Sequence, residues 1–422
     1  MSDHGFHTRA LHVGQGPDSA TGAAAPPIYQ TTSYEFEDAE TAAALYALEE
    51  DDYMYSRIAN PTVRALEERL TSLENGAAGV ATGAGMAALD AATLVLAGTG
   101  DNVVSASSIY GGTHAYLSHT AGRRGIEARF VDTLDPAAYE EAIDDDTAYV
   151  HLETIGNPSL VTPPIEEIAE VAHAHGVPLF VDNTFATPAL CRPLDHGADL
   201  VWESTTKWIH GSGTTVGGIL VDGGTFPWGE HPEKYPELNE SPAFDGLSFV
   251  DRFGDRAFEM ATRHRALRSL GDQQSPFDAW VTMQGLETLP LRMERHCENA
   301  LAVAEFLDEH PDVAWVTYPG LESHETHETA SRYLEGGYGG MVAFGLEDGY
   351  AGGKRVCEET EVATFLANIG DARTLVIHPA STTHAQLSER EQRASGVTPD
   401  LIRLSVGIEN AEDIIADLEA AI

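Results

Sequence analysis

The pattern of apolar and polar residues changes near Gly76, and the chain divides into three parts on this pattern. Residues 1–70 show no regular succession of strands and helices, which predicts an N-terminal arm that cannot fold alone. Residues 71–285 alternate short apolar runs with helical periods, and residues 286–422 mix strands and helices. We therefore predict an α/β domain over 71–285 and a smaller α+β domain over 286–422.

The central part is expected to form a mostly parallel sheet with helices on both faces. Apolar runs of strand length occur at 102–106, 126–131, 148–154, 177–181, 200–203 and 218–221. Helical periods separate these runs, at 85–96, 113–120, 136–143 and 164–175. Strands that alternate with helices in this way are typical of a parallel sheet. The Pro- and Gly-rich segment 223–246 is predicted to be a surface loop.

Composition narrows the class of protein. The 422 residues include 67 Asp and Glu but only 24 Lys and Arg, so the formal net charge is −43. Such a surface repels nucleic acid, and it predicts a protein that needs high salt to screen its own charge. The three cysteines are far apart and form no CxxC pair, which argues against a disulfide framework or a cysteine-based zinc site. With neither an apolar signal segment nor a membrane-length apolar run, we expect a soluble cytoplasmic protein.

Lys207 is the first candidate for chemistry. Only three lysines occur in the chain, and this one lies in a segment rich in glycine and hydroxyl residues, 201–221. A lysine amine, unlike an arginine, can lose its proton and attack a carbonyl carbon. We therefore predict that Lys207 holds pyridoxal 5'-phosphate through an imine. The alternative is a surface lysine in a glycine-rich turn.

Polar residues that follow the predicted strands fit the other needs of this cofactor. Ligands of a parallel sheet bind at the carboxyl ends of its strands. The expected phosphate ligands are the backbone N–H groups that open the helix at 85–96 and two hydroxyls, which belong to Gly85, Met86, Ser204 and Thr206. Tyr110 would cover the ring, and Asp182 would keep the pyridine nitrogen protonated. Glu153 ends another strand, with Asn157 just beyond it.

Two motifs favour other functions only weakly. Residues 83–88 fit the G-x-G-x-x-A fingerprint of a dinucleotide site, which would indicate a nicotinamide-dependent dehydrogenase. No acidic residue ends a strand about 20 positions later, where the ribose needs one. His324 and His327 lack the spacing of a zinc protease and are expected in an exposed loop or helix edge. We predict no metal site.

The chain resembles the Cys/Met-metabolism family of fold type I pyridoxal phosphate enzymes over nearly its whole length. The resemblance is carried by Tyr55-Ser-Arg-Ile-Ala-Asn-Pro-Thr62, Tyr110-Gly-Gly-Thr113, Val181-Asp-Asn-Thr-Phe-Ala-Thr-Pro188, Ser204-Thr-Thr-Lys-Trp208, Pro379-Ala-Ser-Thr-Thr-His384 and Arg403-Leu-Ser-Val-Gly-Ile-Glu-Asn410. Two positions depart from the family pattern. Ala84 stands where relatives usually carry serine, and residues 210–213 read His-Gly-Ser-Gly instead of Gly-Gly-His-Gly.

The resemblance implies a role for each candidate. Lys207 would carry the cofactor and move protons, and Tyr110 would stack on the ring and assist proton transfer. Asp182 would pair with the ring nitrogen, and the phosphate would be held by Gly85, Met86, Ser204 and Thr206. Tyr55 and Arg57 would reach the phosphate of a neighbouring subunit in a homo-oligomer, a tetramer built from active dimers. The substrate carboxylate would be bound by Arg403, the Ser381 region and Asn157.

The resemblance also implies a reaction. It is strongest to members that replace the acetyl group of O-acetyl-L-homoserine with sulfide or a small thiol, which gives homocysteine or methionine and acetate. Cystathionine γ-synthase and a γ-lyase are the alternatives within the family. Outside the family, a dehydrogenase or a non-catalytic binder of the cofactor stays open.

Overall fold

The computed structural model describes residues 4–383, 385, 392 and 396–422. His384, the last residue of one family motif, lies outside the described residues. Two compact units share the chain. The first unit contains Met1–Gly98, Asp199–Thr206 and Thr215–Glu287, and the second contains Thr99–Ala198, Lys207–Thr214 and Thr288–Ile422. The division into 1–70, 71–285 and 286–422 is a different partition and stays a prediction.

The main sheet belongs to an α/β fold, as predicted, because helices alternate with its strands along the chain. Its seven strands run in the order β1-β7-β6-β5-β4-β2-β3. Their bounds are β1 Ala78–Thr82, β2 Asn102–Ala106, β3 Glu127–Val131, β4 Thr147–Glu153, β5 Leu179–Asp182, β6 Leu200–Glu203 and β7 Gly218–Asp222. β2 is parallel to β3 and β4, and β4 is parallel to β5, whereas β7 is antiparallel to β1 and β6. Sequence patterning missed β1.

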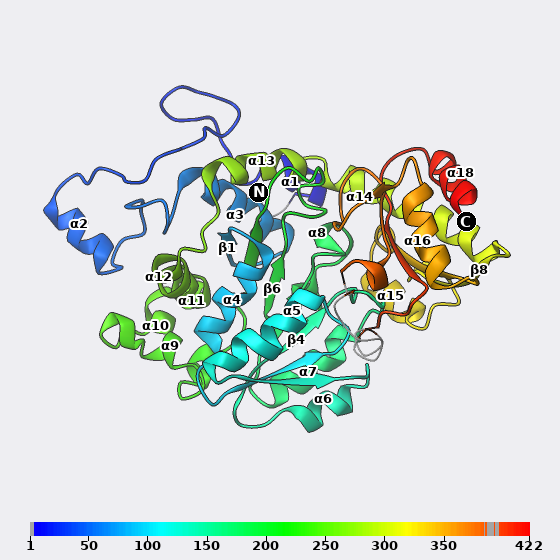
Figure 1. Cartoon of the computed structure of the whole chain (residues 1–422). Helices are drawn as coiled ribbons and strands as arrows, with labels where there is room; N and C mark the ends of the chain where they lie inside the picture. Colours follow the sequence, from blue (N-terminus) through cyan, green and yellow to red (C-terminus); the bar gives the residue numbers. More distant parts are fainter. Residues whose placement is uncertain (1–3, 384, 386–391, 393–395) are drawn as a thin grey trace. The chain divides into compact units, whose positions relative to one another are not determined.

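The first unit holds the N-terminal arm and the helices that follow β7. Its α-helices are α1 Phe6–His12, α2 Ala39–Tyr46, α3 Pro61–Leu73, α4 Gly85–Leu96, α9 Pro236–Asn239, α10 Phe249–Phe253, α11 Ala257–Thr262, α12 Arg268–Leu270 and α13 Pro276–Leu286. Figure 1 shows the chain between α1 and α3 as an extended stretch that carries α2 away from α3. α3 begins where Asn60 caps the Thr62 N–H and Pro61 fills the first turn.

The expectation of a surface loop at 223–246 is wrong in part. The segment forms α9 and two short 3₁₀ turns, and it buries Phe226, Trp228, Tyr235 and Leu238. Trp228 stacks on Phe258 of α11, with 5.5 Å between ring centroids. The aromatic side chains therefore anchor a segment whose Pro and Gly content indicated only a loop.

The second unit adds the other α-helices of the described residues. They are α5 Gly111–Ala115, α6 Pro136–Ala142, α7 Ile165–Ala174, α8 Thr187–Leu190, α14 Leu289–Glu309, α15 His327–Tyr333, α16 Tyr350–Glu359 and α18 Ala411–Ala421. α5 continues into a π-helix, Tyr116–Ala121. His324 and His327, expected to be exposed, are half-buried at the start of α15. Among the residues that the structure describes, no group of side chains could hold a metal ion.

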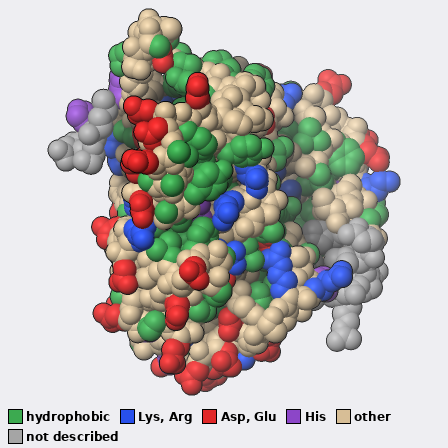
Figure 2. Space-filling model, turned by 90° about the vertical axis from the view of Figure 1, so that its left-hand side faces the viewer, with side chains coloured by type: hydrophobic (Ala, Val, Ile, Leu, Met, Phe, Trp, Pro, Cys, Tyr) green, Lys and Arg blue, Asp and Glu red, His purple; other side chains and the backbone are tan. Residues whose placement is uncertain are grey.

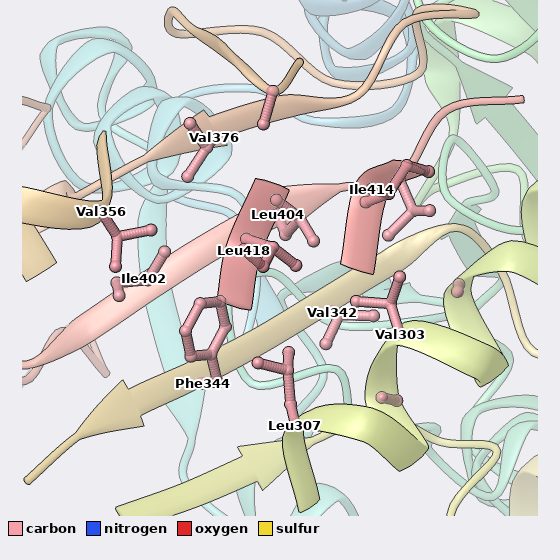
Figure 3. Packing of buried hydrophobic residues seen from close by; sticks show 14 of the residues in the cluster. Val303, Leu307, Val342, Phe344, Val356, Val376, Ile402, Leu404, Ile414 and Leu418 are labelled. Atoms are coloured by element: carbon pink, nitrogen blue, oxygen red, sulfur yellow. The ribbon is translucent and has the colours of Figure 1, made fainter. Parts of the chain in front are cut away.

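A second sheet lies in the C-terminal part of the chain. Its order is β10-β11-β12-β9-β8, with bounds β8 Val313–Thr317, β9 Met341–Leu346, β10 Thr364–Phe365, β11 Leu375–Ile377 and β12 Leu401–Ser405. α14 packs on β8 and β9, and α18 packs on α14 and α16 (Figure 1). Figure 3 shows the apolar core between them, in which Phe344, Leu404 and Leu418 are fully buried. This sheet presents Arg403 on β12.

Two further observations concern the surface. Acidic side chains are spread over the face that Figure 2 presents, most densely toward its lower edge. In the described part of the chain, no helix has both the length and the apolar character needed to cross a lipid bilayer.

Candidate active site

Two acidic side chains end neighbouring strands in the second unit. Glu153 closes β4 and Asp182 closes β5, and the two residues are register partners. Both are buried, with 5% and 6% of their surfaces exposed. The Asp182 carboxylate accepts the Thr184 N–H at 2.9 Å, yet burial raises its pKa to about 7. Such a carboxylate gains free energy from a positively charged partner, for which a protonated ring nitrogen is suited.

Glu153 joins two loops of the same unit. Its Oε1 accepts the Tyr110 N–H at 2.6 Å, and its Oε2 accepts the Asn157 N–H at 3.0 Å. Burial raises the pKa of Glu153 well above its usual range, and the charge of Asp182 raises it further. Sequence reasoning placed Glu153 at a strand end but gave it no role.

Lys207 is partly buried, and its amine is already engaged. Nζ donates to Oδ1 of Asn368 at 2.6 Å. Burial lowers the pKa of Lys207, and the positive charge of Arg403 lowers it further. Gly370 allows the Asn368 segment to approach this closely, because a Cβ at Gly370 would lie 2.6 Å from the Trp208 nitrogen. The site therefore contains an amine that loses its proton more readily than a surface lysine.

Arg403 and Asn157 lie together, as the resemblance implied. Arg403 Nη1 donates to Asn157 Oδ1 at 3.3 Å, and burial lowers the pKa of Arg403. Ser381 is engaged elsewhere, since its hydroxyl lies 2.8 Å from Nδ1 of His378. Arg403 is therefore joined to Asn157, whereas Ser381 has a different partner.

The first unit contains the expected phosphate ligands. α4 begins after Ala84, whose methyl group provides no side-chain cap for the first turn. Gly85 is required there, because a Cβ at this position would lie 2.8 Å from the Ser204 Cβ. The Gly85 and Met86 N–H groups thus open an uncapped helix beside Ser204, an arrangement that suits an anion. The Thr206 hydroxyl donates to Gly217 O at 3.1 Å and accepts the Gly217 N–H at 3.0 Å.

Tyr55 and Arg57 lie side by side in the first unit. The Arg57 guanidinium stands 5.3 Å from the centroid of the Tyr55 ring, and its Nη1 donates to the Arg268 carbonyl. Tyr55 is 41% exposed. A partly buried arginine on an exposed aromatic ring still offers N–H donors to an anion that approaches from outside the chain.

Each unit contains residues that suit one part of pyridoxal phosphate. The second unit supplies a lysine of lowered pKa, a buried aspartate with no basic partner among the described residues, and Tyr110, which is 47% exposed. The first unit supplies an uncapped helix start beside a hydroxyl. The candidate phosphate ligands of the first unit and the candidate residues of the second unit are adjacent in sequence at Thr206 and Lys207. Asn368 is the contact that sequence reasoning missed, since nothing marks a lone asparagine far from the lysine.

Comparisons with known proteins agree with this chemistry. The family model for Cys/Met metabolism PLP-dependent enzymes matches residues 7–422. A homocysteine synthase of Schizosaccharomyces pombe is 50% identical, over 100% of this chain and 98% of its own length. An O-acetyl-L-homoserine sulfhydrylase of Leptospira meyeri is 47% identical, over 98% and 96%. The crystal structure of a putative O-acetylhomoserine (thiol)-lyase of Campylobacter jejuni, which carries a pyridoxyl-lysine, matches with TM-score 0.96 and 39% identity, over 99% of this chain and 100% of that one.

Proposed function

Because the chain belongs to the Cys/Met-metabolism family of PLP-dependent enzymes, we propose that it replaces the acetyl group of O-acetyl-L-homoserine with sulfide or a small thiol. The products are homocysteine, or methionine, and acetate. The relatives named for this activity align over nearly their whole length, which supports the proposal. The observation that carries it is Lys207, a partly buried amine of lowered pKa in the segment that matches the family motif.

Pyridoxal phosphate, when bound, supplies an electron sink for the carbanions that such a replacement requires. We assign its attachment to Lys207 and its ring nitrogen to Asp182. Tyr110 is the ring cover, and the phosphate ligands are Gly85, Met86, Ser204 and Thr206. The Thr206 hydroxyl must then turn from Gly217 or accept a shared hydrogen bond.

Lys207 is the proton carrier of the proposed reaction. Its lowered pKa leaves a larger neutral fraction near neutral pH than an exposed lysine has, so the amine can take the α-proton of the substrate. Asn368 accepts a hydrogen bond from the same amine and would hold it in place whenever it is not covalently engaged. Tyr110 is the second group placed to assist proton transfer.

Arg403 is assigned to the carboxylate of the substrate. A guanidinium presents two parallel N–H donors that match a carboxylate, and Asn157 holds one of its nitrogens at 3.3 Å. Binding there would fix the amino acid while the γ-substituent is exchanged. Ser381 stays a candidate ligand of the same carboxylate if its hydroxyl turns away from His378.

We further propose a homo-oligomer, a tetramer built from active dimers. The arm exposes large apolar side chains, which include Ile28, Tyr29, Tyr46 and Tyr55. A second copy of the chain that covers this arm would place Tyr55 and Arg57 against its own cofactor phosphate. Sedimentation of the holoprotein tests this assembly, and a monomer of full activity would contradict it.

One experiment tests the function directly. The purified protein is incubated with pyridoxal phosphate, its visible absorption band is recorded, and borohydride is added to fix the imine. We expect the label on Lys207 by peptide mapping. The same preparation is assayed with O-acetylhomoserine and sulfide and, separately, with cystathionine alone. Homocysteine formed only from the first pair supports the proposal, whereas turnover of cystathionine alone would overturn it.

The net charge of the chain is the basis for a proposal about the salt concentration that the protein requires. A net charge of −43 opposes the compact state unless dissolved ions screen it. We therefore propose that stability and activity rise with salt concentration. Thermal unfolding in dilute buffer and in concentrated salt tests this, and equal midpoints in both would reject it.

A further inference from the structure

Glu153 is a buried carboxylate that makes two main-chain contacts and no ion pair among the described residues. Each of its oxygens accepts one N–H, from Tyr110 at 2.6 Å and from Asn157 at 3.0 Å. Both oxygens of the carboxyl group therefore act as hydrogen-bond acceptors, one for each loop. A carboxylate that costs free energy to bury is retained here without a cation to compensate it.

The two loops that Glu153 joins are pressed together beside it. The Ser108 hydroxyl is hydrogen-bonded to the Ser159 hydroxyl. A Cβ at Gly156 would lie 2.9 Å from the Ser108 carbonyl oxygen, so only glycine fits this approach. The Glu153 carboxylate accepts a backbone N–H from each of the two loops.

Each loop carries a residue assigned to the active site. Tyr110 is the N-terminal cap residue of α5, and its ring is the proposed cover of the cofactor. Asn157 accepts a hydrogen bond from Arg403, the proposed ligand of the substrate carboxylate. Glu153 is also the register partner of Asp182 on the adjacent strand. One carboxylate therefore touches the supports of the cofactor ring and of the substrate.

We propose that Glu153 is a positioning residue, whose carboxyl group holds the Tyr110 and Asn157 backbones in the places that cofactor and substrate require. The inference rests on the proposed function. An amide cannot replace the carboxylate, because its NH₂ group would face one of the two N–H donors. An aspartate is one methylene shorter and cannot reach both donors from the same strand position.

The test uses Glu153→Gln with Glu67→Gln as its matched control. Glu67 is buried to the same degree, in the first unit, and likewise accepts a backbone N–H, from Ala81 at 2.9 Å. The apoproteins are titrated with pyridoxal phosphate, the bound cofactor is examined by visible circular dichroism, and kcat and KM are measured for O-acetylhomoserine. These readouts separate the positioning of ligands from the stability of the fold.

We expect Glu153→Gln to weaken cofactor affinity about tenfold and to raise KM about tenfold, since one buried N–H loses its acceptor and meets an NH₂ group, which disturbs the two joined loops. The circular dichroism of the bound cofactor should change because the Tyr110 ring moves. Glu67→Gln should lower the unfolding temperature and leave cofactor affinity and KM within about twofold of wild type. If wild type neither binds the cofactor nor turns over, the proposed function fails. If wild type does both and Glu153→Gln matches it, the inference is wrong.

A second measurement covers the case in which Glu153→Gln does not fold. Glu153→Asp is combined with Asn157→Ala in a double-mutant cycle on KM. We expect the two effects to overlap, because both act on the support of Arg403. Independent, additive effects on KM, or a Glu153→Asp variant equal to wild type, would overturn the proposal.

Discussion

Buried charge is handled differently in the two units. In the first unit, Arg263 donates to Glu67 at 2.9 Å and to Glu259 at 2.7 Å, and all three side chains are almost fully buried. Burial opposes the charge on Arg263, yet the two glutamates raise its pKa overall. In the second unit, Glu153 and Asp182 are also buried, but no described Lys or Arg pairs with either, and the pKa of each is raised.

The presence or absence of a basic partner distinguishes a cluster that serves the fold from a group of residues that binds a ligand. A buried charge without a partner costs free energy, so a fold under no other demand either pairs it or replaces it. The Arg263 cluster is complete within the chain. The Glu153 and Asp182 pair is complete only when something positively charged arrives, and the ring nitrogen of pyridoxal phosphate is the partner we propose. Substitutions in the first cluster should therefore reduce stability, whereas substitutions in the second should reduce cofactor binding.

The largest effect is expected at Lys207. Lys207→Ala removes the amine that we assign to cofactor attachment and proton transfer, and we expect turnover to fall at least about 10³-fold. The fold should survive, because the side chain has few structural contacts. Activity with O-acetylhomoserine and sulfide is measured beside far-ultraviolet circular dichroism. Lys354→Ala, at an exposed pair with Glu358, is the control and should keep full activity. Retained turnover in Lys207→Ala would remove the basis of the proposed site.

A substitution in the Arg263 cluster should lower the stability of the protein and leave its activity unchanged. Glu67→Gln leaves the Arg263 charge buried with one partner fewer, and we expect a loss of about 3 kcal/mol in the free energy of unfolding. Denaturant unfolding measures it, and cofactor affinity at low denaturant is the parallel readout. A Glu67→Gln variant as stable as wild type would mean that the two clusters do not differ as described.

Substitution of Asp182, unlike substitution of Glu67, should increase the stability of the apoprotein. Its pKa of about 7 lies above the unfolded value of about 3.9, so the folded state binds more protons between these limits. The contribution of Asp182 to stability is therefore present at low pH and is lost as pH rises toward 7. Asp182→Asn cannot titrate, and we expect its apoprotein to melt about 3 °C above wild type at pH 8, a gap that closes at acid pH. Melting curves at several pH values test this, while cofactor affinity should fall.

The sequence predicted the sheet better than it predicted the contacts. The strands at 102–106 and 200–203 agree with β2 and β6 because they are short apolar runs with clear ends. β1 was missed, since Ala78–Thr82 contains two alanines and a glycine and has little strand character. The strand-end rule selected Asp182 and Tyr110 as candidates, since a parallel sheet gathers its carboxyl ends, and their roles stay a prediction. Contacts made by distant loops leave no such pattern.

Asn368 is the clearest of these contacts and carries the smallest predicted effect. It lies 161 positions from Lys207 and accepts the Nζ hydrogen bond at 2.6 Å. Asn368→Ala removes this acceptor, and we expect kcat to fall about tenfold with little change in cofactor affinity. Asn368→Asp places a negative charge at the amine and raises its pKa, so the ascending limb of the pH–rate profile should move to higher pH. Steady-state kinetics across pH measures both.

The control for Asn368 is an asparagine of similar burial that serves only the fold. Asn239 in the first unit donates to the Trp228 carbonyl at 3.0 Å, and Asn239→Ala should alter stability without moving the pH–rate profile. A profile that is unchanged in Asn368→Asp would show that the amine does not stay near residue 368 during turnover. In that case the contact would belong to the cofactor-free protein alone. The lowered pKa of Lys207 would be unaffected by this outcome, because burial and the charge of Arg403 account for it.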